Sequence, residues 1–305
     1  MHPHSHDHDR HRHLPGAGRA FAIGIALNAI FVLAEWICGI MANSLSLIAD
    51  ATHNFSDVLG LVLAWGALAL ARRPPSTRFT YGLRGTTILA ALGNAMLLLV
   101  ATGGIAWEAI LRFKSPAAAN ETIMIWVAVL GVLINAGTAL LFMGGSKTDL
   151  NVRGAYLHMA ADAGVSLGVA IAGVGMLFTG WTWLDPVTSL LIITVIVVGT
   201  WGLLRDSVKL ALQAAPANVN PVDVRRYLAG LPGVSEVHDL HIWAMSTTET
   251  ALTVHLVMPA GHPGDEFFST VVHHVEDRFR IGHATIQIET GTSDKPCILA
   301  PDHVV

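Results

Sequence analysis

Apolar residues fill six long segments of this chain, and polar residues are concentrated in the connections between them. Each apolar segment has about the 20 residues that a helix needs to cross the hydrocarbon core of a membrane. The connections carry residues that end helices, such as Arg72-Arg73-Pro74-Pro75 after the second segment. We therefore predict six transmembrane helices, at about residues 20–41, 45–71, 86–111, 122–143, 155–179 and 183–205.

The composition is that of a membrane protein. Hydrophobic residues make up 52% of the 305 residues and charged residues only 13%, whereas soluble domains carry about 25% charged residues. The formal net charge of -4 argues against a nucleic-acid partner. Two cysteines, Cys38 and Cys297, are too few for a disulfide framework or a thiolate metal cage. We expect no signal peptide, because the N-terminus lacks an apolar core.

Basic residues in the short connections predict the orientation of the chain. One side collects eleven Lys and Arg residues, and the other side has only Arg112 and Lys114. Because basic connections stay in the cytoplasm, both termini are expected there. The N-terminal tail, residues 1–18, is rich in histidine. Such a tract either collects metal ions weakly on the cytoplasmic side or is a tail with no such role.

After the sixth segment the composition changes to that of a soluble domain. Pro221 starts a predicted short helix, and alternating apolar residues predict strands. The predicted order is a helix, two strands at 234–245 and 250–258, a helix at 265–280 and a strand at 284–290. The fold class is therefore an α-helical membrane protein with six transmembrane helices and a C-terminal cytoplasmic α+β domain, αββαβ, ferredoxin-like in arrangement. The predicted parts are the tail 1–18, the transmembrane domain 19–212 and the cytoplasmic domain 213–305.

Two of the apolar segments each carry a His and an Asp spaced four residues apart, His53 with Asp57 and His158 with Asp162. This spacing places both side chains on one face of a helix, one turn apart. A charged residue at the bilayer centre costs roughly 2.5–3.5 kcal/mol on insertion scales, so such residues are candidates for function. The four groups are expected to face one another and share a ligand.

Two imidazoles and two carboxylates suit a tetrahedral zinc ion. Magnesium and calcium prefer oxygen ligands and copper(I) prefers sulfur, whereas Cd2+, Co2+ and Fe2+ stay open. The alternative is that the two pairs only join helices by hydrogen bonds, and the duplicated spacing argues against it. Asp50 is expected near the outer mouth of the bundle, where it helps to release metal or is merely solvated.

These motifs resemble the cation diffusion facilitator family of proton-coupled divalent-metal transporters. The similarity covers the six spans and the segments NSLSLIADATHNFSD, AYLHMAAD, DPVTSL and VHDLHIW…VHLV…HATIQIE. The resemblance implies a homodimer in the lipid bilayer, in a bacterium the inner membrane. It implies that metal leaves the cytoplasm by alternating access while protons (H+) enter. The transport site it implies is made of His53, Asp57, His158 and Asp162.

The resemblance also implies additional metal sites in the cytoplasmic domain. The residues at the corresponding places are His238, His255, His283 and Glu289, with Asp239 and His241 as further candidates. The alternative is a surface with scattered, solvated histidines. No metal is expected in the connection between the second and third spans, because residues 72–84 hold no Asp, Glu or His.

Three functions are compatible with these residues. The first is efflux of zinc or a related cation in exchange for protons, which is chemically consistent because protons and metal compete for imidazole and carboxylate. The second is a membrane-anchored metal sensor, but a sensor would not need two buried His–Asp sets. The third, an intramembrane zinc hydrolase, needs an open coordination position and a general base. No H-E-x-x-H motif is present, so we predict that the protein is not an enzyme.

Overall fold

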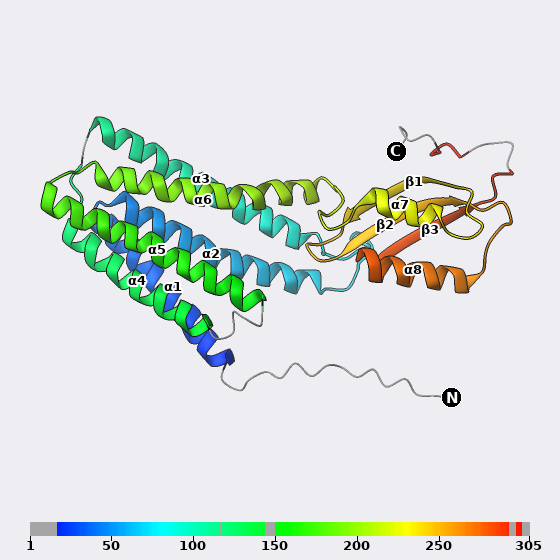
Figure 1. Ribbon diagram of the computed structural model, residues 1–305, viewed down its shortest axis with the longest axis horizontal. Coiled ribbons are helices and arrows are strands. Elements are labelled where there is room, and N and C mark those ends of the chain that lie inside the picture. The colour runs from blue at the N-terminus through cyan, green and yellow to red at the C-terminus, as the bar shows by residue number, and fades with distance from the viewer. Residues whose placement is uncertain (1–16, 116, 144–149, 293–296, 301–305) are drawn as a thin grey trace. The chain divides into compact units, whose positions relative to one another are not determined.

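The computed structural model describes residues 17–115, 117–143, 150–292 and 297–300, with side chains from residue 29 onward except those of residues 150–152, 154 and 155. The His-rich tail therefore lies outside the described residues. In the described part, six long helices precede a small α+β domain (Figure 1). The elements are α1 (Ala17–Met41), α2 (Leu45–Ala71), α3 (Thr86–Lys114), α4 (Glu121–Met143), α5 (Leu150–Thr179), α6 (Leu184–Ala211), α7 (Pro221–Ala229), β1 (Glu236–Ala244), β2 (Thr250–Val257), α8 (Asp265–Phe279) and β3 (His283–Glu289).

The long helices follow the predicted apolar segments. Within the described residues, the five helices α2 to α6 are long and apolar enough to cross a membrane, and α1 adds the apolar stretch Ala29–Met41. The helices α3, α5 and α6 extend beyond the predicted segments by several residues. Hydropathy marks the apolar part of a helix, whereas its backbone hydrogen bonds continue through the polar turns that follow.

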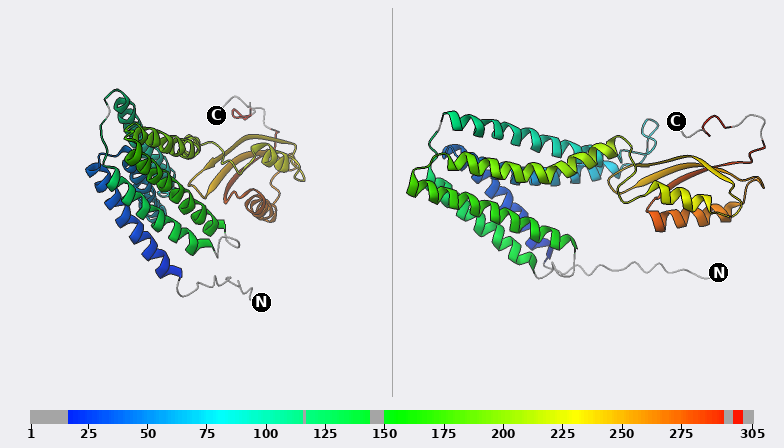
Figure 2. Two further views of the ribbon diagram at one scale, coloured as in Figure 1. Left: turned by 60° about the vertical axis from the view of Figure 1, so that its left-hand side comes forward. Right: turned by 45° about the horizontal axis from the view of Figure 1, so that its top comes forward.

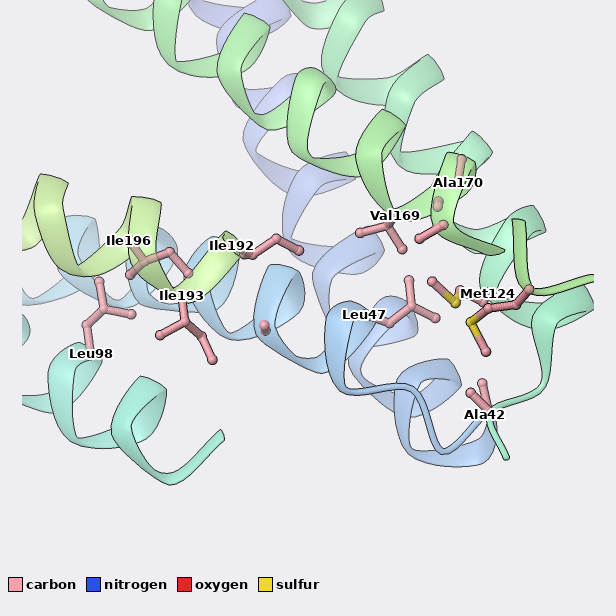
Figure 3. Close-up of a cluster of buried hydrophobic side chains, with 14 residues drawn as sticks. Ala42, Leu47, Leu98, Met124, Val169, Ala170, Ile192, Ile193 and Ile196 are labelled. Atoms are coloured by element: carbon pink, nitrogen blue, oxygen red, sulfur yellow. The ribbon is translucent and has the colours of Figure 1, made fainter. Parts of the chain in front are cut away.

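The chain forms two compact units, and the division cuts through α2, α3 and α6. The first unit contains the chain up to Val58 together with Leu98–Val197. The second contains Leu59–Leu97 and Val198–Val305. Buried side chains from several helices form the core of the first unit, and Figure 3 shows Leu47, Met124 and Val169 pointing toward one another.

The start of α2 is held by the buried carboxylate of Asp185, which lies in the first turn of α6. The hydroxyl of Ser44 donates to it at 2.6 Å, and that of Ser46 at 2.7 Å. The backbone N–H groups of Leu45 and Ser46 donate to the same carboxylate at 2.8 and 3.1 Å. Because the first N–H groups of a helix have no partner inside the helix, Asp185 caps α2 from another element.

The tight turn before α2 depends on Asn43, whose φ of 53° lies in the left-handed region. Asn tolerates this conformation better than most residues. The guanidinium of Arg112 from α3 donates to the Asn43 carbonyl at 2.6 Å and to its side-chain oxygen at 2.7 Å. These contacts bind the turn between α1 and α2 to the end of α3.

The C-terminal domain contains a three-stranded mixed sheet in the order β1-β2-β3. Strand β1 runs antiparallel to β2, and β3 runs parallel to β2. Helices α7 and α8 lie on the same side of this sheet (Figure 2). They bury Val224, Leu228, Val271 and Val275 in one core with Leu252, Val254 and Leu256 of β2. The element order is the predicted one, and the strand and helix bounds agree within two residues.

Removing the Asp185 carboxylate should destabilise the protein. We expect Asp185→Ala to lower the free energy of unfolding by about 2–4 kcal/mol, because four buried donors lose a charged acceptor. The measurement is the midpoint of thermal unfolding in detergent. Asp206→Ala is the control, since its side chain lies on the same helix and is 56% exposed. Equal midpoints for the two variants would contradict the capping role.

Candidate metal sites

The first unit brings the four predicted His and Asp side chains of α2 and α5 together. The Nε2 atom of His158 lies 3.1 Å from Asp57 Oδ2 and 3.6 Å from Asp162 Oδ2. The Nε2 atom of His53 lies 3.7 Å from Asp57 Oδ2 and 3.7 Å from Asp162 Oδ1. The spacing of four residues produces this convergence, because each helix presents its His and Asp on one face.

The nitrogen–oxygen separations are close to those expected around a single bound cation. Ligand atoms around a tetrahedral zinc ion with bonds of about 2.0–2.1 Å lie about 3.3 Å from one another. The four N–O separations in this cluster range from 3.1 to 3.7 Å. Asp57 Oδ2 and Asp162 Oδ2 are buried and have no hydrogen-bond partner in the described part of the protein. Ligand atoms of His53, His158 and Asp162 all lie within 4.8 Å of one another, close enough to share one cation, whereas Asp57 is outside this group of three and lies near it only through its contacts with the two imidazoles.

Exposure differs sharply among the four ligand candidates. The Asp162 side chain is 4% exposed, whereas those of His158 and Asp57 are 42% and 35% exposed in the protein alone. His158 and Asp57 therefore lie at the more exposed side of the cluster. The buried Asp162 carboxylate forms the floor of the site.

Asp50 lies inside the first unit and is not solvated at a helix end. Its carboxylate is 1% exposed and accepts hydrogen bonds from Ser166 Oγ at 2.9 Å and Asn54 Nδ2 at 3.4 Å. The solvated alternative for Asp50 is therefore wrong, because this part of α2 faces α5. The sequence period shows that Asp50 and Asp57 share one face of α2, but it does not show which helix packs against that face.

A second cluster lies in the C-terminal domain, on the face of the sheet opposite α7 and α8. Side chains alternate along a strand, and Val254 and Leu256 of β2 enter the core, so His255 points to the other side. His238 of β1 is the cross-strand partner of His255. Ligand atoms of His238, His255, Glu289 and Cys297 all lie within 4.8 Å of one another.

The four side chains of this cluster provide two nitrogens, one oxygen and one sulfur. Glu289 Oε1 lies 3.0 Å from His255 Nδ1, and Glu289 Oε2 lies 3.5 Å from His238 Nε2. Cys297 Sγ lies 3.6 Å from His255 Nδ1. Burial alone would raise the pKa of the Glu289 carboxyl, but hydrogen bonds with Cys297 and Gln287 and the two nearby histidines outweigh burial and lower it. The ionised carboxylate is the form that binds metal, and the donor set suits zinc.

The structure does not bring His283 into this cluster. His283 and Glu289 lie at opposite ends of β3, six residues apart, which separates them by roughly 20 Å at about 3.3 Å per residue. The His283 ring instead contacts the ring of Tyr81, with centroids 5.4 Å apart. Sequence reasoning missed Cys297, because it considered only cages made of several thiolates. The available signal for a thiolate ligand was that Cys297 closely follows a domain that carries several histidines.

Asp239 and His241, the two further candidates, lie beside the cluster. The register of β1 against β2 shifts between His238 and His241, and Asp239 in this irregular segment has a φ of 49°. Such a bulge redirects side chains. Asp239 Oδ2 lies 3.4 Å from His255 Nε2, and its Oδ1 lies 2.8 Å from His241 Nε2. Asp239 is thus placed to orient His255.

Cobalt binding tests whether Cys297 is a ligand. We expect Co2+ added to the purified protein to produce a thiolate-to-metal charge-transfer absorption, which Cys297→Ser should abolish because it removes the sulfur. Cys38→Ser is the matched control, since it removes the other cysteine of the chain. An absorption band that survives in Cys297→Ser, or disappears in Cys38→Ser, would contradict the assignment.

Comparisons with known proteins agree with the arrangement of the chain. A family profile described as the cation efflux transmembrane domain matches residues 21–210, and one described as the cation efflux protein, cytoplasmic domain, matches residues 216–291. The metal cation efflux system protein CzcD of Cupriavidus metallidurans is 39% identical, over 90% of this chain and 87% of that protein.

Two further relatives cover similar shares of the chain. The zinc transporter ZitB of Escherichia coli is 37% identical, over 89% of this chain and 87% of that protein. A Bacillus subtilis protein named cadmium, cobalt and zinc/H(+)-K(+) antiporter is 32% identical, over 85% of each chain. These similarities extend through both the helical region and the C-terminal domain.

Proposed function

Because the chain belongs to the cation efflux family, we propose that it exports zinc or a related divalent cation from the cytoplasm in exchange for protons. The observation that carries this proposal is the convergence of His53, Asp57, His158 and Asp162 between α2 and α5. Four isolated ionisable groups in apolar helices are costly unless they serve a ligand or one another. Their donor atoms suit zinc, and Cd2+, Co2+ and Fe2+ are the alternatives.

The names of the relatives support the class of substrate. ZitB is named a zinc transporter, and the Bacillus protein is named for cadmium, cobalt and zinc and for antiport. Its name includes H+, which supports proton exchange in this chain. The relatives are named as transporters and not as enzymes, which supports our prediction that this protein is not an enzyme.

Competition between protons and metal provides the mechanism. Metal binding requires neutral imidazole and ionised carboxylate, so protonation of the same atoms releases the ion. Histidine exchanges protons near neutral pH because its unperturbed pKa is about 6.5. In alternating access, the site opens to the cytoplasm to bind metal and then to the opposite side, where protonation drives release.

The remaining assignments complete the proposal. We infer that α1 is the sixth span, because its stretch Ala29–Met41 is apolar. The distribution of basic residues supports cytoplasmic termini in a bacterial inner membrane. We propose the same division as the sequence predicts: an N-terminal tail (1–18), a transmembrane domain (19–212) and a cytoplasmic domain (213–305). The cytoplasmic domain is ferredoxin-like in arrangement. The name of its matching profile, ZT_dimer, supports a homodimer.

The C-terminal cluster is the observation that favours a second role, metal sensing. Its ligands His238, His255, Glu289 and Cys297 would bind zinc in the cytoplasmic domain. As an alternative to transport, the protein would be a membrane-anchored sensor whose helices only hold this domain at the membrane.

Loss of one ligand separates transport from sensing. We expect Asp57→Asn to reduce zinc flux into proteoliposomes by at least about tenfold, since changing even indirect partners of a metal costs about 10–100-fold. The cobalt absorption of the C-terminal domain should persist in this variant. Glu108→Gln is the control, because its side chain is 50% exposed. Unchanged flux in Asp57→Asn would refute the transport site.

Proton exchange predicts a dependence on the pH gradient. Zinc uptake into proteoliposomes should accelerate when their interior is more acidic than the outside, because protons then leave as metal enters. The measurement is the initial rate of uptake with and without the gradient, repeated with Cd2+ and Co2+. Collapse of the gradient with a protonophore is the control. Rates that do not depend on the gradient would exclude proton coupling.

A further inference from the structure

The second unit contains a cavity at the polar end of α6. Its volume is about 440 Å³, within the range of about 300–1,000 Å³ that small-molecule sites occupy. It is lined by the last turns of α6, the connection from α6 to α7, the turn between β1 and β2, and the residue that follows α8. All of these segments belong to the same compact unit. Neither metal cluster shares a residue with this cavity, so it calls for a ligand of its own.

The turn between β1 and β2 gives the cavity an ordered polar wall. The hydroxyl oxygen of Ser246, a buried residue, accepts hydrogen bonds from the N–H groups of Thr248 at 3.2 Å and Glu249 at 3.0 Å. The N–H group of Thr247 donates to Thr87 Oγ1 of α3 at 3.1 Å. Because these bonds fix the backbone of the turn, its polar side chains line the cavity in a defined arrangement.

The two acidic residues that line the cavity already have cationic partners. Glu249 Oε1 lies 2.6 Å from Arg84 Nη1, and Asp206 Oδ1 lies 3.4 Å from Arg205 Nε. Neither of these two arginines lines the cavity. The two carboxylates are therefore balanced by charges from outside it.

Two further residues of the lining, Lys209 and Arg280, are cations without such partners. Lys209 belongs to the last turn of α6, and Arg280 directly follows α8. Within the described part of the chain, neither side chain forms an ion pair or a hydrogen bond. The cavity thus carries two uncompensated positive charges. Ammonium and guanidinium groups of this kind bind phosphoryl oxygens through charge-assisted hydrogen bonds.

The place of Lys209 along α6 points to the source of such a phosphate. From Leu184 to Leu204 the helix contains one charged residue, Asp185, and at about 1.5 Å per residue this stretch matches the hydrocarbon core of about 30 Å. Lys209 lies about 7 Å beyond it, at the depth of the lipid headgroups. Trp201 is exposed on the last apolar turns, as tryptophan commonly is at a membrane interface. Acyl chains can lie against this part of α6 while a headgroup enters the cavity.

We propose that the cavity binds the headgroup of an anionic phospholipid, with Lys209 and Arg280 donating hydrogen bonds to its phosphoryl oxygens. The hydroxyl-bearing side chains of Thr247 and Thr248 line the same cavity and suit a polyol such as the glycerol of phosphatidylglycerol. The inference goes beyond the proposed export of metal and does not depend on it. A free phosphate ester shares the phosphoryl chemistry, and the titrations below separate the two sources.

Titration of the full-length protein with short-chain lipids tests the inference. In detergent and zinc-free buffer, calorimetry should show binding of dihexanoyl phosphatidylglycerol to the wild-type protein. The double variant Lys209→Gln/Arg280→Gln should bind it about thirtyfold more weakly, since each cation near an anionic headgroup contributes about fivefold. Arg72→Gln/Arg73→Gln is the matched control, because it removes the same charge just after α2 and outside the cavity. Its affinity should equal that of the wild-type protein.

Ala217→Phe is a second variant that leaves the charge unchanged. Ala217 is exposed and lines the cavity, so a larger side chain there should fill the space and weaken binding of the lipid. If Lys209→Gln/Arg280→Gln does not fold, Ala217→Phe decides the question by itself. Wild-type affinity in the cavity variants, or an equal loss in the arginine control, would overturn the cavity as the site.

Three further titrations identify the ligand. Dihexanoyl phosphatidylcholine, which has the phosphate but no net charge, should bind more weakly than phosphatidylglycerol, and equal binding would overturn the preference for an anionic lipid. Glycerol phosphate and inorganic phosphate should also bind more weakly, because they lack the acyl chains. If either bound as tightly as the lipid, the ligand would be a free phosphate and the assignment to a lipid would be wrong.

Discussion

The convergence of two His–Asp pairs between α2 and α5 is the constraint on which the first unit depends. Each pair occupies one turn of an apolar helix, where the surrounding apolar side chains offer its ionisable groups no further partners. The two helices must face each other at the same level for His158 Nε2 to lie 3.1 Å from Asp57 Oδ2. Rotation of either helix by one residue would turn its pair away from the other. The polar residues therefore specify which faces of α2 and α5 meet.

The cap at the start of α2 supports the same alignment. Asp185 binds the hydroxyl groups and N–H groups of the first turn, and His53 follows Ser46 by seven residues, about two turns. A helix held at its first turn presents its next turns in a fixed direction. The hydroxyls of Ser44 and Ser46 thus act at a distance on the site, although neither residue contacts it.

Local patterns in the sequence predict the helices, the strands and the candidate site between α2 and α5, because all of them depend on the periodicity of residues along the chain. Hydropathy identifies the helices, and the spacing of four residues identifies His53, Asp57, His158 and Asp162. In the C-terminal cluster, the family resemblance names His238, His255 and Glu289, but Cys297 needed tertiary information. Cys297 reaches His255 from beyond the last strand, and no local pattern predicts where that segment returns. The hydrogen bond from Ser166 of α5 to Asp50 of α2 likewise depends on which helices are neighbours, and the period of neither helix contains that information.

The two candidate metal sites differ in a way that fits different tasks. The site between α2 and α5 offers nitrogen and oxygen, whose protonation competes with metal near neutral pH. The C-terminal cluster adds a sulfur, and thiolate is the softer ligand that zinc sites use when they retain their ion. Transport requires binding that is strong enough for entry and weak enough for release. A thiolate between α2 and α5 would slow release, so the absence of cysteine from the described part of those two helices agrees with an ion that passes through.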